Sequence, residues 1–159
     1  MKSGSTLFLK VVIILIGIVA LAGLIRFPLT EGRAAHLDLL SIYLDPVIVY
    51  MFVASIPFFV ALYQAFKLLG FIGQNKVFSL SSVKTLRIIK YCASAIAGFI
   101  VVGIVVLVIT HHGEDDPAGP VALGIFTTFT SIVVATAAAV FEKLLQSAVD
   151  LKSENDLTV

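Results

Sequence analysis

The chain has 159 residues, of which 59% are hydrophobic and only 13% are charged, and its formal net charge is +1. A soluble domain usually carries about a quarter charged residues, so this composition excludes an ordinary soluble protein and indicates a membrane protein. The single cysteine, Cys92, excludes an internal disulfide and a cysteine-rich metal site, and it fits best as a small apolar residue.

Four apolar stretches approach or exceed the roughly 20 helical residues that cross the hydrocarbon core of a bilayer. They are residues 7–28, 46–69, 88–110 and 120–141. The first also has an interpretation as a cleaved signal peptide, in which Ala20-Leu21-Ala22 resembles a cleavage site. Its apolar run continues through Pro28, however, which favours an uncleaved span.

The basic residues are distributed unequally about these spans. Threading the chain alternately across the membrane leaves Arg26 and Arg33 on one side and nine cations on the other: Lys2, Lys10, Lys67, Lys76, Lys84, Arg87, Lys90, Lys143 and Lys152. Because basic residues near span ends favour the cytoplasm, we expect both termini to be cytoplasmic in a multi-pass protein of the inner membrane. The loops are too short for a folded domain, so residues 1–159 form a single membrane domain.

Two local features stand out in the first half of the chain. Residues 34–44 place leucines three and four apart, which predicts a short helix in the outer interface with Tyr43 at headgroup depth. Pro57 lies near the middle of the second span, where its missing N–H predicts a kink. That kink is either a packing feature or a hinge.

The inner loop leads into the third helix. Gly70 and Gly73 predict a turn, after which Ser79 or Ser81 can cap a helix that runs into the third span without interruption. This helix carries a basic stripe at three-residue spacing, formed by Lys84, Arg87 and Lys90. The stripe is either a set of anchors for anionic headgroups or a docking surface for an acidic partner or the chain's own acidic tail.

The fourth helix is expected to continue beyond the membrane. Its pattern runs from residue 120 to residue 153, which at 1.5 Å per residue corresponds to about 51 Å. One face of the extension carries Phe141, Leu145 and Ala148, and another carries Glu142, Gln146 and Asp150. The apolar face needs cover, for which the inner-loop helix is the nearest candidate.

Residues 153–159 form either a solvated tail or a docking segment that adds as a strand to the sheet of a partner. Together with the basic stripe, they complete our candidate partner-binding residues: Lys84, Arg87, Lys90, Glu154, Asp156, Thr158 and Val159.

Small residues at three- and four-residue spacing predict close helix packing in a compact bundle, with self-association into a homo-oligomer as an additional use. They are Gly17, Ala20 and Gly23 in the first span, Ala61 and Ala65 in the second, Ser94 and Gly98 in the third, and Gly124, Thr128, Ser131, Ala135 and Ala139 in the fourth. We expect the hydroxyls within the spans, such as those of Tyr50, Thr127 and Thr136, to form hydrogen bonds between helices.

Titratable residues are missing from the depth of every span, which argues against proton-coupled transport and intramembrane proteolysis. The one metal-like cluster is His111, His112, Glu114, Asp115 and Asp116 in the second outer loop. Adjacent histidine side chains diverge and Gly113 loosens the loop, so a solvated turn is favoured over a cation site. We expect no catalytic residues, no metal and no cofactor.

Several segments resemble a known family. They are Ser-Thr-Leu-Phe-Leu-Lys at residues 5–10, Ser-Ile-Pro-Phe-Phe at residues 55–59, the inner-loop segment 76–92 and residues 150–159. The chain resembles, over essentially its whole length, the four-span membrane proteins called domain of unknown function 2975. The resemblance implies a bacterial cytoplasmic-membrane protein, often encoded beside a small helix-turn-helix regulator, and it carries no established activity.

These observations predict an all-α integral membrane four-helix bundle whose last helix extends into the cytoplasm. Our leading hypothesis is a non-enzymatic partner that binds a cytosolic protein, such as a small helix-turn-helix regulator, and does not bind nucleic acid directly. The alternative is a small transporter, channel or immunity-type protein that acts on a membrane-active molecule. Pro57 and the hydroxyl-rich fourth span motivate this alternative.

Overall fold

Five α-helices make up almost all of the part of the chain that the computed structural model describes, residues 3–30, 38–110 and 118–156. They are α1 (Ser3–Thr30), α2 (Leu39–Tyr43), α3 (Pro46–Gly73), α4 (Leu80–Thr110) and α5 (Ala118–Asp156). Four of them are long and apolar enough to cross a membrane. The predicted all-α class with four membrane spans is therefore confirmed.

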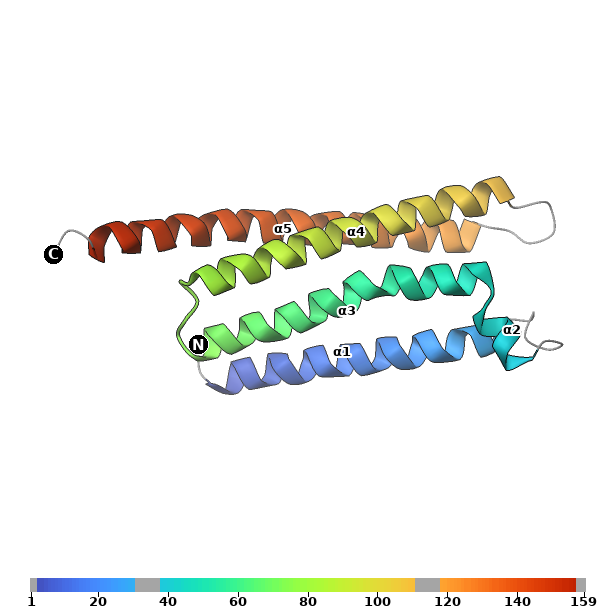
Figure 1. Cartoon of the computed structure of the whole chain (residues 1–159), viewed down its shortest axis with the longest axis horizontal. Helices are drawn as coiled ribbons and strands as arrows, with labels where there is room; N and C mark the ends of the chain where they lie inside the picture. Colours follow the sequence, from blue (N-terminus) through green and yellow to red (C-terminus); the bar gives the residue numbers. More distant parts are fainter. Residues whose placement is uncertain (1–2, 31–37, 111–117, 157–159) are drawn as a thin grey trace.

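The four long helices pack in chain order, α1 against α3, α3 against α4 and α4 against α5 (Figure 1). Within the described residues, no Cα atom of α1 lies within 8 Å of one in α4 or α5, and none of α3 lies that close to α5. Packed helices have axes about 8–10 Å apart, so these pairs are not in direct contact. The four-helix bundle is open, and each long helix contacts only its neighbours along the chain.

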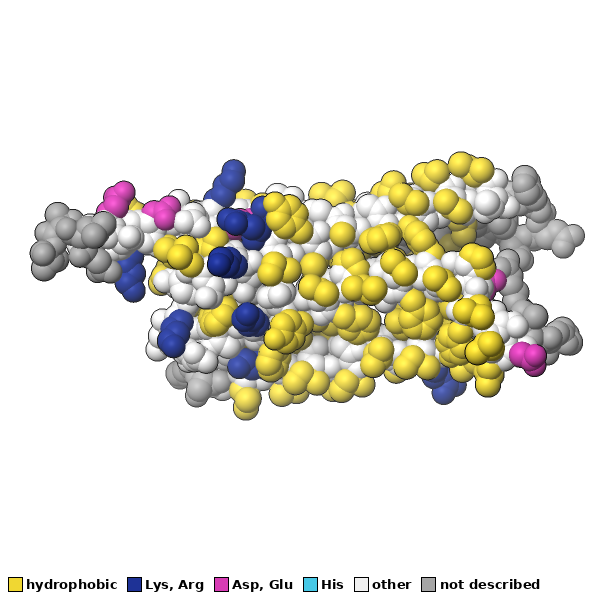
Figure 2. Space-filling view, viewed as in Figure 1, with side chains coloured by type: hydrophobic (Ala, Val, Ile, Leu, Met, Phe, Trp, Pro, Cys, Tyr) yellow, Lys and Arg dark blue, Asp and Glu magenta, His cyan; other side chains and the backbone are white. Residues whose placement is uncertain are grey.

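Charge and hydropathy divide the molecule along its length. On the face shown in Figure 2, hydrophobic side chains cover the middle of the molecule and extend to one end, while most Lys and Arg gather at the other end. We call this the basic end; it contains Lys10, Lys67, Lys76, Lys84, Arg87, Lys90, Lys143 and Lys152. Many large hydrophobic side chains of this apolar band are exposed, as expected for a surface that lipid chains cover.

Small residues do mark the contact between α4 and α5, although their predicted register is only partly correct. Ser131 is buried as expected, but on the same helix Ala138 is buried and Ala139 only half-buried. On α4 the buried small residues are Ala93 and Ala97, whereas Ser94 and Gly98, one position later, are exposed. One residue is about 100° of helix rotation, which spacing alone does not determine.

Most hydroxyls within the spans bond to their own helix, contrary to our prediction. Thr127, Thr130 and Thr136 each donate to the carbonyl four residues earlier, at 2.8–2.9 Å. A hydroxyl reaches that carbonyl readily when no acceptor on another helix is closer. Tyr50 of α3 behaves as predicted, because its hydroxyl donates to the carbonyl of Phe99 on α4.

Side-chain hydrogen bonds hold the connection that leads into the start of α3. α2 is shorter than the predicted helix over residues 34–44, part of which lies outside the described residues. The half-buried Tyr43 donates its hydroxyl hydrogen to the carbonyl of Ile25 at 3.0 Å, which ties α2 to α1. Asp45 caps α3 by accepting from the Val47 amide at 2.8 Å. Further along, α3 runs through Pro57 without ending.

α5 projects beyond the other helices at the basic end (Figure 1). The helix continues to Asp156, three residues further than predicted. At 1.5 Å per residue, the part after Phe141 is about 22 Å long, so it stands clear of the apolar band. The predicted extension of the last helix beyond its membrane span is confirmed.

Candidate functional site

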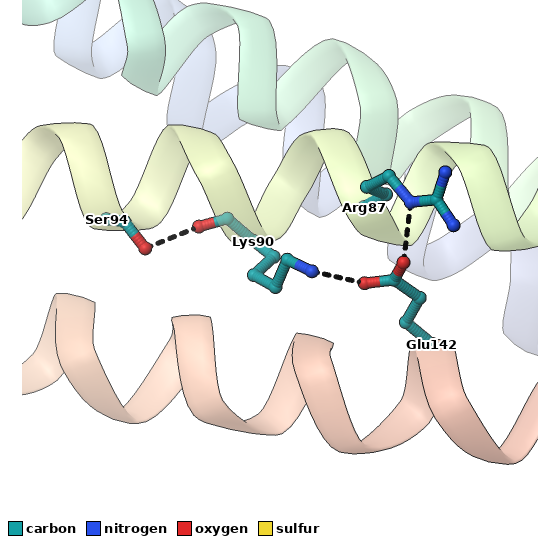
Figure 3. A network of polar contacts seen from close by, with 4 residues as sticks. All are labelled: Arg87, Lys90, Ser94 and Glu142. Atoms are coloured by element: carbon teal, nitrogen blue, oxygen red, sulfur yellow. Dashed lines mark hydrogen bonds and ion pairs between the residues drawn. The ribbon is translucent and has the colours of Figure 1, made fainter.

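The basic stripe of α4 is divided in the structure. Lys84 is exposed, and within the described residues it forms no ion pair. Arg87 and Lys90, by contrast, both contact the carboxylate of Glu142 on α5 (Figure 3). Two of the three predicted docking cations are therefore bound within the chain itself.

The contacts of Glu142 are short and use both carboxylate oxygens. Arg87 donates from Nε to Oε1 at 2.6 Å, and Lys90 donates from Nζ to Oε2 at 2.7 Å. The side chain of Glu142 is 10% exposed, whereas those of Arg87 and Lys90 are 51% and 26% exposed. The carboxylate is thus the enclosed member, and the two cations cover it from the surface.

Glu142 follows the apolar stretch of residues 120–141 and lies outside it, at the basic end. The hydrogen bonds from Lys90 and then Arg87 lower the pKa of its carboxyl below the ordinary value, and burial opposes them only in part. A carboxylate that accepts two charge-assisted hydrogen bonds remains ionised at neutral pH. The cluster of Arg87, Lys90 and Glu142 therefore keeps one net positive charge.

The packing of α4 on α5 explains why these side chains meet. On α5, the half-buried or buried positions towards α4 follow alternating four- and three-residue steps: Gly124, Thr128, Ser131, Ala135, Ala138 and Glu142. On α4, a matching series is Leu86, Lys90, Ala93, Ala97, Ile100 and Ile104. Steps of this kind are typical of two helices that cross at a small angle. Lys90 and Glu142 are the charged members of the two series.

The apolar face predicted for the α5 extension is only partly the buried one. Leu145 and Ala148 are half-buried, but Phe141 is 58% exposed and Glu142 takes the enclosed position. At the start of α4, Ser82, Val83, Thr85 and Leu86 are buried, so the inner-loop helix does cover part of the extension. The small-residue series of α5 was recognised in the sequence with Ala139 as its last member, whereas the register through Ala138 leads directly to Glu142.

Only part of the predicted tail lies within the described residues. Glu154 is exposed near the end of α5, and Asp156 ends the helix. Thr158 and Val159 lie outside the described residues, as does the cluster of residues 111–116. Within the described residues there is no group of three His, Cys, Asp or Glu that could hold a metal ion.

Lysines at the basic end also lie over aromatic rings. Lys10 Nζ is 5.2 Å from the centre of the Phe66 ring, and Lys90 Nζ is 4.9 Å from that of Tyr91. Rings and cations at one level are typical of a membrane interface. We therefore expect the hydrocarbon core to end near the level of Lys10, Phe66, Lys90 and Glu142.

Beyond this level the structure contains an open cleft of about 740 Å³, which sequence reasoning did not predict. The end of α3, the loop that follows it and the start of α4 form one wall, and Ala148 and Lys152 of the α5 extension form the other. Only the packing of α5 against α4 brings these segments, more than 60 residues apart in the chain, to the same place.

Comparison with known proteins agrees with a membrane protein without an assigned activity. The chain is 45% identical to the "Uncharacterized membrane protein YoaS" of Bacillus subtilis (strain 168), over 161 aligned residues that cover the whole of both chains. No solved structure gives a significant match. Residues 28–159 match the model of the family described as "Protein of unknown function (DUF2975)". The chain belongs to this family of membrane proteins.

Proposed function

We propose that this protein is a non-enzymatic membrane partner that binds a cytosolic protein at its basic end. The observation that carries the proposal is the α5 extension, which continues as a helix for about 22 Å beyond the apolar band. The contacts of Glu142 with Arg87 and Lys90 hold its base against α4. A helix that only spanned the membrane would not need this projecting, braced segment.

The proposal places the basic end in the cytoplasm of a bacterial cell, with the protein in the inner membrane. Eight described Lys and Arg side chains belong to this end, and Arg26 belongs to the opposite one. The positive-inside rule favours this orientation. Surfaces at the basic end then face cytosolic proteins directly.

The partner that we propose is a small helix-turn-helix regulator. Its association with the family is what the resemblance implies. Arg87 and Lys90 contribute little to the docking surface, because Glu142 already neutralises part of their charge. Lys84 and the exposed residues of the α5 extension remain as the surface for the partner. In this proposal the protein binds the regulator and not the nucleic acid.

Vesicle flotation tests the proposal. The purified protein is reconstituted into neutral phosphatidylcholine vesicles, and protease digestion of the α5 extension shows what fraction of molecules has the basic end outside. The small helix-turn-helix regulator encoded beside the gene should float with these vesicles and should stay at the bottom with empty ones. If the regulator does not float with vesicles whose basic ends are exposed, the proposed function is wrong.

A further inference from the structure

The cleft at the basic end has a fixed wall. The end of α3 is closed by backbone bonds from Asn75 to Ile72 and from Lys76 to Phe71, at 3.2 and 2.9 Å. This is the Schellman pattern, and Asn75 has the positive φ of 56° that it requires. The loop is therefore held in one conformation before any partner arrives.

The start of α4 fixes the same loop from its other side. Ser79 donates its hydroxyl hydrogen to the Lys76 carbonyl at 2.9 Å and accepts from the Ser82 amide at 3.3 Å, which makes Ser79 the cap of α4. The hydroxyl of Ser82, which is fully buried, also donates to the Lys76 carbonyl, at 3.2 Å. With its carbonyl bonded twice, Lys76 has a fixed backbone, and its exposed side chain lines the cleft.

The lining of the cleft combines positive charge with aromatic surface. Lys76 and Lys152 lie on opposite walls, and none of the lining residues is acidic. Within the described residues neither lysine forms an ion pair. Phe71 and Phe78 also line the cleft, and Phe78 is 61% exposed. An occupant with carboxylates and an apolar side chain complements this surface.

The depth of the cleft selects between a lipid and a protein as occupant. Lys152 is ten residues beyond Glu142, which corresponds to about 15 Å along α5. The headgroup layer of one leaflet is only about 5–7 Å thick beyond the hydrocarbon core. Lys152 therefore lies beyond the expected level of the lipid phosphates, where a cytosolic protein can reach it.

We propose that this cleft binds an acidic segment of the cytosolic partner, with its carboxylates on Lys76 and Lys152 and an apolar side chain against Phe78. The inference rests on the proposed function and adds to it the binding site and the chemistry of the partner segment. It also assigns the docking role to Lys76 and Lys152 in place of the Arg87–Lys90 part of the stripe.

Two probes test the cleft, both with the full-length protein in neutral lipid nanodiscs. The first is a fluorescent peptide in which Glu and Leu alternate, with a Lys–Leu peptide as its control. The second is the helix-turn-helix regulator. Lys76→Glu and Lys152→Glu should each weaken binding of the Glu–Leu peptide about tenfold, since they replace attraction with repulsion. Arg26→Glu, the same charge reversal at an exposed position of the opposite end, should alter it less than twofold.

The outcomes separate the two proposals. If the regulator binds the wild-type protein and both cleft variants equally, the cleft inference is overturned while the proposed function stands. If the regulator binds none of them, the proposed function fails, and loss of Glu–Leu peptide binding in the two variants still supports the cleft. If, in nanodiscs that also contain phosphatidylglycerol, the variants co-purify with less of this lipid than the wild type and bind the peptide as before, the cleft is a lipid site and the inference is wrong.

Discussion

Lys90 Nζ lies 2.7 Å from Oε2 of Glu142, so a cation at the start of the third span is paired with a carboxylate just beyond the end of the fourth. The pair stands at the boundary of the hydrocarbon core, where water no longer screens charge fully. It therefore fixes both the axial register of α4 on α5 and the face that α5 turns inward.

A double-mutant cycle should detect this pairing. Glu142→Gln is expected to lower the free energy of unfolding by about 1–2 kcal/mol, because the enclosed carboxylate loses two charge-assisted bonds. The double mutant with Glu142→Gln and Lys90→Gln should show a coupling energy of about 1 kcal/mol between the two side chains. Equilibrium unfolding in mixed dodecyl maltoside and SDS micelles, followed by circular dichroism, measures both quantities. Lys84→Gln serves as the matched control, and a coupling to Glu142 as large as that of Lys90 would contradict the prediction.

The same cluster predicts a loss of stability in acid. The pKa of Glu142 is lower in the folded protein than its ordinary value of 4.5. Its contribution is therefore complete above that value and is lost as the pH falls below it, through the lowered pKa. Thermal unfolding in detergent between pH 7 and pH 3 should show a steeper decline for the wild type than for Glu142→Gln. Parallel pH profiles for the two proteins would show that the carboxylate is not linked to folding.

Gly124 should tolerate a side chain poorly. A Cβ atom added there would lie 2.6 Å from Cδ1 and 2.9 Å from Cγ1 of Ile104, so α4 and α5 would have to separate or Ile104 would have to change rotamer. Gly124→Ala is expected to cost about 1–2 kcal/mol of stability. Gly98→Ala, which meets no atom within 4 Å, should be neutral or slightly stabilising. The same micelle titration compares them, and equal stability of the two variants would rule out close contact at Gly124.

The orientation of the basic end can be tested with single cysteines. Cys92 is the only cysteine, so Cys92→Ser provides a background without thiols. In that background, Ser153→Cys on the α5 extension should react with a membrane-impermeant maleimide in inside-out vesicles and not in intact spheroplasts. Leu40→Cys, at an exposed position in α2 at the opposite end, should react in intact spheroplasts and not in inside-out vesicles. Labelling of residue 153 in intact spheroplasts would place the basic end outside the cytoplasm.

The sequence was sufficient to predict the elements but not their rotation. The lengths of the apolar stretches, together with the positions of Pro, Gly and Ser, predicted the four spans and the α5 extension. They also predicted that Ser79 or Ser81 caps the third long helix, and in the structure the cap is Ser79. These features depend on neighbours within a few residues, which a single sequence displays directly.

The errors concern contacts between helices. Ser94 and Gly98 were expected at an interface that Ala93 and Ala97 occupy, and Phe141 was expected to be covered where Glu142 is. Which of two adjacent residues faces a neighbour depends on the packing of the whole helix pair, and a shift of one residue changes the face. The cleft was missed for the same reason, because its two walls come from distant parts of the chain.

The chain-order packing of the long helices has a consequence for biosynthesis. Because, among the described residues, each long helix packs only against the long helices before and after it, no span has to wait for a distant long helix before it can pack. The nascent chain can therefore assemble in the bilayer from the N-terminus onward, one helix at a time, as each leaves the translocon. α5, synthesised last, completes the basic end by adding Glu142 to Arg87 and Lys90 and the second wall to the cleft. A truncated or stalled chain would lack both, so only the finished protein would present the surface.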